Sequence, residues 1–221
     1  MKYSIWISAI GLSLAAGLLA GCVASQTSQT TLTGDVLIRN VETVSFEGPE
    51  PVTLKDQFIL IEDGRITHVS DSAEGLTAAI VIDGAGQTLI PGLTDMHVHV
   101  WGEAELGAYL AHGVTTVRNM SGMPFHLNMA ERIESGELAG PRLLTTGPIL
   151  NSSGPNQQIN HQIVETAEEA RNAVRWQYEQ GFRHLKLYSN LSSEAYRAIR
   201  EEADALGMTI TCHTPEGHRY T

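Results

Sequence analysis

The chain has 221 residues, of which 42% are hydrophobic and 18% charged, the composition of an ordinary globular protein with one sizeable core. Its formal net charge is -11, and its 14 lysines and arginines are scattered, so nucleic acid is excluded as an expected partner. Residues 1–21 combine a basic Lys2 with an apolar run too short to span a bilayer, which predicts a signal peptide.

The apolar run ends in Leu19-Ala20-Gly21-Cys22, which resembles the lipobox of bacterial lipoproteins. The resemblance implies that Cys22 becomes the lipid-bearing mature N-terminus. We therefore expect a lipid-anchored protein of the bacterial cell envelope that contacts the membrane through this lipid. A plain signal peptide followed by an incidental cysteine is the alternative. Residues 22–33 are rich in Ser, Thr and Gln and are predicted to form a polar tether.

Residues 34–90 are predicted to be mainly β-structure, because short apolar runs alternate with turn signals. Asp63-Gly64 lies between two of these runs and indicates a hairpin. The segment is expected to form a small β-sandwich. Its predicted strands are residues 35–40, 58–61, 65–69, 79–82 and 88–90.

From residue 91 to 221, strand-like runs alternate with helical ones, which predicts a parallel sheet covered by helices. Thr166 and either Ser192 or Ser193 have the residue type and position of helix N-caps. The predicted strands are residues 93–99, 114–117, 142–146, 184–188 and 208–213, and the predicted helices are 103–112, 125–135, 166–180 and 192–206.

This repetition predicts an α/β fold, a partial (β/α)8 TIM-like barrel with about five of the eight units. A complete barrel needs about 250 residues for its eight units. We therefore expect residues 91–221 to be the first part of a longer barrel. An unusual open sheet is the alternative.

Candidate metal ligands lie near the ends of three predicted strands. Residues i and i+2 of a strand point to the same face, so His97 and His99 aim two imidazoles at one point. Imidazole is a common ligand for zinc and similar metals. Lys186 lies near the end of the fourth strand and His213 ends the fifth, at the edge where barrel active sites lie.

Lys186 needs a physical explanation in such a place, because an ammonium group beside a divalent cation is strongly repelled. Carboxylation by CO₂ would convert the amine to a carbamate, with one negative charge and two oxygens that can bridge two metals. The alternative is that Lys186 pairs with a carboxylate inside an ordinary barrel.

Residues 91–99, with the sequence PGLTDMHVH, resemble the amidohydrolase superfamily, and its imidazolonepropionase-like and prolidase-like branch is the most similar. The stretches GVTTVR (113–118), LKLY (185–188) and CHTP (212–215) are similar to that branch in order and spacing. The resemblance implies one or two divalent metal ions, with zinc expected. His97 and His99 would hold the first ion, Lys186 as a carbamate would bridge, and His213 would hold the second. Asp95 would lie behind these ligands and orient a histidine ring.

The activity implied by the resemblance is hydrolysis of a C–N bond in an amide, peptide or cyclic amide by a metal-activated hydroxide. The substrate would be a small molecule or dipeptide-like, with Tyr188 lining its pocket and Arg118 binding a substrate carboxylate. His126 and His161 lie on predicted loops or helix starts. His161 is expected to be a solvated loop histidine, and the alternative is that it approaches the site from the loop after the third barrel strand.

The family pattern also has a histidine on the sixth strand and, on the eighth, an aspartate that ligates metal and moves the proton. Neither is among these 221 residues, so no catalytic residue is assigned. We expect the 221-residue chain alone to bind metal poorly and not to turn over substrate. The alternatives are a non-catalytic fragment, a lipid-anchored solute-binding protein, or a deaminase with one metal and no carbamate.

Overall fold

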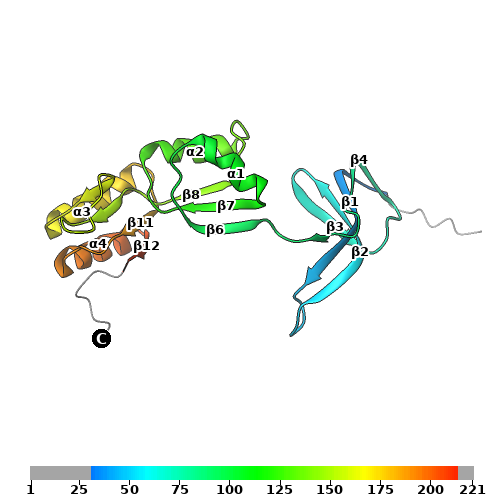
Figure 1. Ribbon diagram of the computed structural model, residues 1–221, viewed down its shortest axis with the longest axis horizontal. Coiled ribbons are helices and arrows are strands. Elements are labelled where there is room, and N and C mark those ends of the chain that lie inside the picture. Colours follow the sequence, from blue (N-terminus) through cyan, green and yellow to red (C-terminus); the bar gives the residue numbers. More distant parts are fainter. Residues whose placement is uncertain (1–30, 214–221) are drawn as a thin grey trace, which may run out of the picture. The chain divides into compact units, whose positions relative to one another are not determined.

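The computed structural model describes residues 31–213, and the chain divides between Ile90 and Pro91 into two compact units (Figure 1). The predicted signal peptide, Cys22 and most of the predicted tether lie outside the described residues. Among residues 31–213, no helix has the length and apolar character needed to cross a membrane.

The described strands of the N-terminal unit form one mixed five-stranded sheet, with order β3-β2-β1-β4 and β5 paired to β1. The predicted β-rich character is confirmed, but these residues form a single sheet and not the two facing sheets of a sandwich. The strands are β1 (Leu32–Ser45), β2 (Val52–Glu62), β3 (Arg65–Ser70), β4 (Leu76–Asp83) and β5 (Thr88–Leu89).

Strand β1 is longer than predicted because it hydrogen-bonds on both edges. It runs antiparallel to β2 and parallel to β4 and β5. It begins at Leu32, inside the segment predicted to be a tether, and it continues past Asn40. Asn40 has a positive φ of 54° within a register shift of the β1–β2 pair, so the apolar alternation is interrupted there. The predicted strand therefore ends at residue 40, where the structure has a bulge and not a strand end.

The C-terminal unit contains two parallel sheets, β6-β7-β8 and β10-β9-β11-β12. The Gly147 amide, which follows β8, donates to the His184 carbonyl of β11 at 3.0 Å. This hydrogen bond links the two sheets. The predicted α/β fold with a partial parallel barrel is confirmed. Its strands are β6 (Leu93–Val98), β7 (Val114–Asn119), β8 (Arg142–Thr145), β9 (Ile149–Asn151), β10 (His161–Ile163), β11 (His184–Leu187) and β12 (Thr209–Cys212).

Helices cover one face of these strands. Figure 1 shows α1 and α2 alongside β6, β7 and β8, and α3 and α4 beside β11 and β12. Leu185 and Leu187 of β11 are fully buried in one core cluster with residues of α3 and α4, so Lys186 between them belongs to the opposite face. The helices are η1 (Glu103–Glu105), α1 (Leu106–Ala111), α2 (Pro124–Glu134), α3 (Ala167–Glu179) and α4 (Ser193–Ala205).

The helix starts follow the sequence signals. The Thr166 hydroxyl accepts the Glu169 amide and the Glu169 carboxylate accepts the Thr166 amide, both at 3.2 Å, which is a capping box. The Ser192 hydroxyl accepts the Ala195 amide at 3.1 Å, so Ser192 and not Ser193 is the cap of α4.

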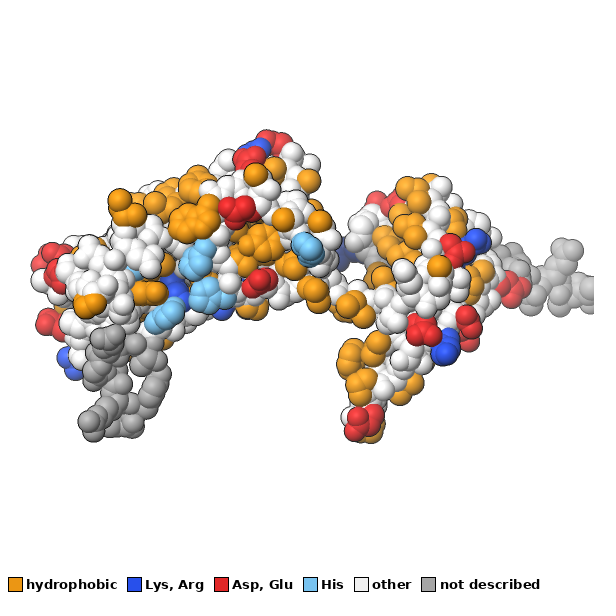
Figure 2. All heavy atoms as spheres, in the orientation of Figure 1, with side chains coloured by type: hydrophobic (Ala, Val, Ile, Leu, Met, Phe, Trp, Pro, Cys, Tyr) orange, Lys and Arg blue, Asp and Glu red, His pale blue; other side chains and the backbone are white. Residues whose placement is uncertain are grey.

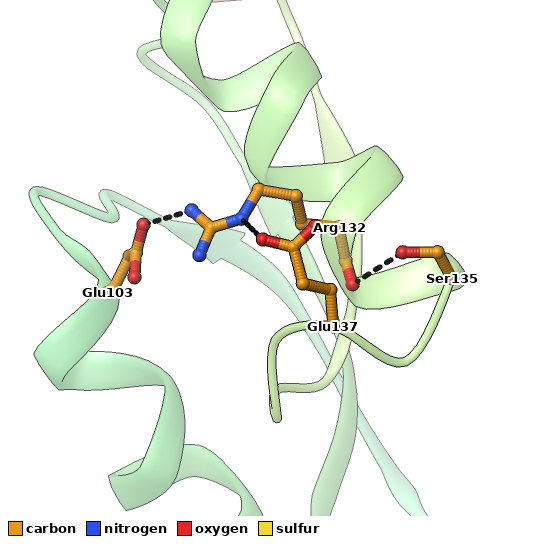
Figure 3. Close-up of polar contacts among 4 residues, drawn as sticks. All are labelled: Glu103, Arg132, Ser135 and Glu137. Carbon is orange, nitrogen blue, oxygen red and sulfur yellow. Dashed lines mark hydrogen bonds and ion pairs between the residues drawn. The ribbon is translucent and has the colours of Figure 1, made fainter.

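An ion-pair cluster fixes the connection that follows β6. Figure 3 shows Arg132 near the end of α2 between Glu103 of η1 and Glu137. The Arg132 Nε donates to Glu137 at 2.8 Å, and the Ser135 hydroxyl donates to the Arg132 carbonyl at 3.1 Å. The cluster is partly exposed, so its contribution to stability is expected to be small. It orders the chain immediately after the His97–His99 segment.

Candidate metal centre

The histidines predicted to bind metal lie around one cavity of about 320 Å³ at the carboxyl ends of the barrel strands. Figure 2 shows histidine side chains gathered on one face of the C-terminal unit, with a basic side chain among them. All four predicted ligands and Tyr188 line the cavity. The lining residues are His97, His99, Trp101, Ile149, Gln158, Asn160, His161, Lys186, Tyr188 and His213.

Strand parity brings the ligands together. The ring centroids of His97 and His99 are 5.5 Å apart, and those of His97 and His213 are 6.4 Å apart. His213 follows β12, where its amide donates to the Leu187 carbonyl at 3.1 Å. Lys186 is 2% exposed.

These separations test whether the residues fit a metal. With a zinc–nitrogen distance of about 2.1 Å, two imidazoles on one ion have ring centroids roughly 5 to 6 Å apart. The 5.5 Å between His97 and His99 suits a shared ion. The 6.4 Å to His213 suits a neighbouring ion. Among residues 31–213, no three His, Cys, Asp or Glu side chains form a group that could hold a metal ion.

Lys186 is a nearly buried lysine that lines the cavity. Within residues 31–213 no carboxylate forms an ion pair with it. Burial and, to a lesser extent, the nearby charge of Arg118 lower the pKa of Lys186, with Cys212 opposing. A lowered pKa makes the neutral amine, the form that reacts with CO₂, more available. The residue therefore fits a carbamate ligand.

Two of the histidines are also held in the form that binds metal. Burial, followed by the charge of Lys186 and the neighbouring imidazoles, lowers the pKa of both His97 and His213. A neutral imidazole has a free lone pair for coordination. Trp101 stacks on His99 with ring centroids 6.3 Å apart, at the rim of the cavity.

The structure does not bring two other predicted residues into the cavity wall. The Asp95 carboxylate accepts the His97 backbone amide at 3.0 Å, so it contacts the main chain rather than a histidine ring. The Arg118 Nε donates to the Met96 carbonyl at 2.8 Å, and Arg118 lines a separate hollow with His184. The charge of Arg118 adds a small part to the lowering of the Lys186 pKa, which is mainly due to burial.

His161 lines the cavity, which agrees with the less favoured of its two sequence-based interpretations. It was expected to be a solvated loop histidine, but it lies on the short strand β10, and burial lowers its pKa. Its ring packs 4.9 Å from Tyr188, and Tyr188 packs 4.5 Å from His213. The available signal was its place after the third barrel strand, where barrel loops face the active site.

Comparison with known proteins supports the same family. The L-hydantoinase of Paenarthrobacter aurescens is 31% identical over 120 residues, 49% of this chain and 25% of that protein. The imidazolonepropionase of Aromatoleum aromaticum is 40% identical over 70 residues, 30% of this chain and 17% of that protein. No family model matches the chain.

Solved structures match over more of the chain. A putative prolidase from Bifidobacterium longum has a TM-score of 0.70 and 25% identity, over 82% of this chain and 49% of that one. A crystal structure titled as an amidohydrolase has a TM-score of 0.67 and 26% identity, over 81% of this chain and 56% of that one. The amidohydrolase resemblance is confirmed. The chain spans about half of these two structures and a quarter or less of the two curated relatives.

Proposed function

We propose that this chain belongs to a metal-dependent hydrolase that cleaves C–N bonds in small amide, peptide or cyclic amide substrates. The observation that carries the proposal is the convergence of His97, His99 and His213 with the nearly buried Lys186 on one cavity. The relatives include a hydantoinase, an imidazolonepropionase and a putative prolidase by name, which supports the C–N bond as the reacting group.

His97 and His99 would hold one divalent ion, His213 would hold a second, and Lys186 as a carbamate would bridge them. The neutral amine nitrogen would form a bond to the carbon of CO₂ and lose one proton; counted from the ammonium form, two protons are released and a cation is replaced by an anion. A divalent ion bound there would supply Lewis-acid polarisation of a carbonyl and a lowered pKa for water. Zinc is the expected ion.

The other cavity residues would bind the substrate. Tyr188 and Trp101 present aromatic faces at the wall and rim of the cavity, which suits a small organic substrate. Among the described residues that line the cavity there is no Asp or Glu. The lining therefore favours substrates that carry oxygen acceptors over cationic ones.

Zinc binding tests the proposal directly. The chain is stripped with chelator, incubated with zinc and bicarbonate, and its zinc content is measured after removal of free metal. We expect weak but measurable zinc binding in the unmodified chain, because further ligands of the family pattern are not among these residues, and a loss of at least tenfold in affinity for His97→Ala or His99→Ala. The matched control is His112→Ala, because His112 is exposed and lies outside the cavity. Equal zinc content in all four proteins would refute the assignment.

The bridging role of Lys186 has its own measurement. Native mass spectrometry at neutral pH is expected to detect one CO₂ adduct, absent from Lys186→Met. A chain that binds a single zinc without the adduct would instead favour a one-metal deaminase, and adenine deaminases are among the similar proteins.

We also propose that the protein is anchored to the bacterial cell envelope through lipid on Cys22, which lies outside the described residues. Metabolic labelling with a radioactive or clickable fatty acid tests this in a bacterial host. Label is expected on the unmodified chain and absent from Cys22→Ser. Label on both proteins, or on neither, would contradict the anchor.

A further inference from the structure

A buried ring N–H without an acceptor lies beside the candidate metal centre. His161 lines the cavity, and its Nε2 atom is buried with no hydrogen-bond partner among the described residues. Buried donors in native proteins are nearly always paired, so an unpaired one requires an explanation.

The neighbours of His161 decide which nitrogen carries the proton. The Asn190 amide donates to Asn151 Oδ1 at 3.0 Å, which fixes the orientation of the Asn151 side-chain amide. Asn151 Nδ2 therefore donates to His161 Nδ1, at 3.2 Å. The Gln158 amide approaches the same atom at 3.3 Å. Because both partners are donors, Nδ1 must accept, and the proton of the neutral ring resides on Nε2.

The surroundings keep this donor available. Tyr188 packs against the His161 ring, with ring centroids 4.9 Å apart, and both residues line the cavity. The described cavity lining contains no carboxylate that would take the His161 proton. An incoming ligand would supply the acceptor that the described residues do not provide.

We propose that His161 is a substrate-binding residue that donates its Nε2–H to an oxygen of the substrate, either the amide carbonyl or a carboxylate. The assignment rests on the proposed function for its substrate, but the donor itself is independent of any metal. Two hydrogen bonds into Nδ1 hold the ring in place before the ligand arrives, so the donor is already oriented.

Two probes separate the two kinds of oxygen. N-acetylglycine offers a carbonyl and a carboxylate, and N-acetylglycinamide offers carbonyls only. Their affinities are measured by NMR titration for the unmodified chain, His161→Phe and the exposed-site control His112→Phe. A donor to the carbonyl predicts that His161→Phe weakens both probes by about 2- to 12-fold. A donor to the carboxylate predicts a loss of about 10- to 150-fold for N-acetylglycine alone. The control is expected to bind both probes normally.

The ring itself gives a second readout that does not need a variant to fold. Long-range ¹H–¹⁵N spectra of the unmodified chain are expected to show His161 as the Nε2–H tautomer, with its Nε2 signal shifting on addition of the bound probe. An Nδ1–H tautomer, an unchanged Nε2 signal with both probes, or equal affinities in His161→Phe and the unmodified chain would overturn the proposal. Zinc content is measured on the same samples. If the unmodified chain bound no zinc, the proposed function would be contradicted, whereas the His161 result would still hold.

Discussion

Replacing Lys186 by Met is expected to stabilise the metal-free, CO₂-free chain while removing its capacity to bind the proposed metals. Lys186 is 2% exposed, it forms no ion pair with a carboxylate within residues 31–213, and burial lowers the pKa of its amine, so the charged form is disfavoured in the folded chain. Leaving a buried polar group unpaired costs about 1–3 kcal/mol, and Met retains an unbranched apolar stem of similar length. The expected gain in the free energy of unfolding is therefore about 1–3 kcal/mol at neutral pH.

The pH dependence has a definite sign. Burial lowers the pKa of Lys186 in the folded chain below its ordinary value of 10.5, so the unfolded chain binds the proton more tightly. The lysine therefore destabilises the fold below its folded pKa, and this penalty disappears as the pH rises towards 10.5. The stability difference between Lys186→Met and the unmodified chain should shrink correspondingly between about pH 7 and about pH 10.

Urea unfolding in chelator and CO₂-free buffer measures both effects. Lys55→Met makes the same charge change at a side chain that is 75% exposed, and it should shift stability by less than about 0.5 kcal/mol. If Lys186→Met lowered stability at neutral pH, or if its effect did not change with pH, the amine would not be a desolvated cation. The argument for its conversion to a carbamate would then lose its physical basis.

Two further comparisons test the scaffold. Ser192→Ala should lower the free energy of unfolding by about 1 kcal/mol through loss of the α4 cap, whereas Ser193→Ala should change it by less than about 0.5 kcal/mol. Equal effects in urea unfolding would contradict the assigned cap. Gly122→Ala would place its Cβ 1.6 Å from the Thr146 carbonyl oxygen, a backbone clash expected to cost about 1–3 kcal/mol or more. Gly107→Ala in α1 meets nothing within 4 Å and should stabilise by about 0.5–1 kcal/mol, so a lower melting temperature for it would refute this reading.

The sequence was sufficient where local rules decide the structure. Alternation along residues 184–188 placed Leu185 and Leu187 against helices and Lys186 on the opposite face, as the two buried leucines bear out. It was insufficient where pairing between distant strands decides. Strand β1 extends to Ser45 because β2 and β5 pair with residues beyond Asn40, and no pattern within β1 itself encodes those partners.

His126 and His161 show why the candidate site was only partly predictable. Both are histidines outside the main barrel strands, and no local pattern distinguishes them. In the structure both nitrogens of His126 have partners, with Nδ1 accepting the Met123 amide at 2.9 Å and Nε2 2.8 Å from the Val100 carbonyl. His126 is therefore a structural residue that ties α2 to the segment after β6. His161 has partners at Nδ1 only. The difference depends on which distant groups the fold brings to each ring. The sequence shows that each residue is a histidine, but only the structure shows which ring nitrogen has no partner and can contact a ligand.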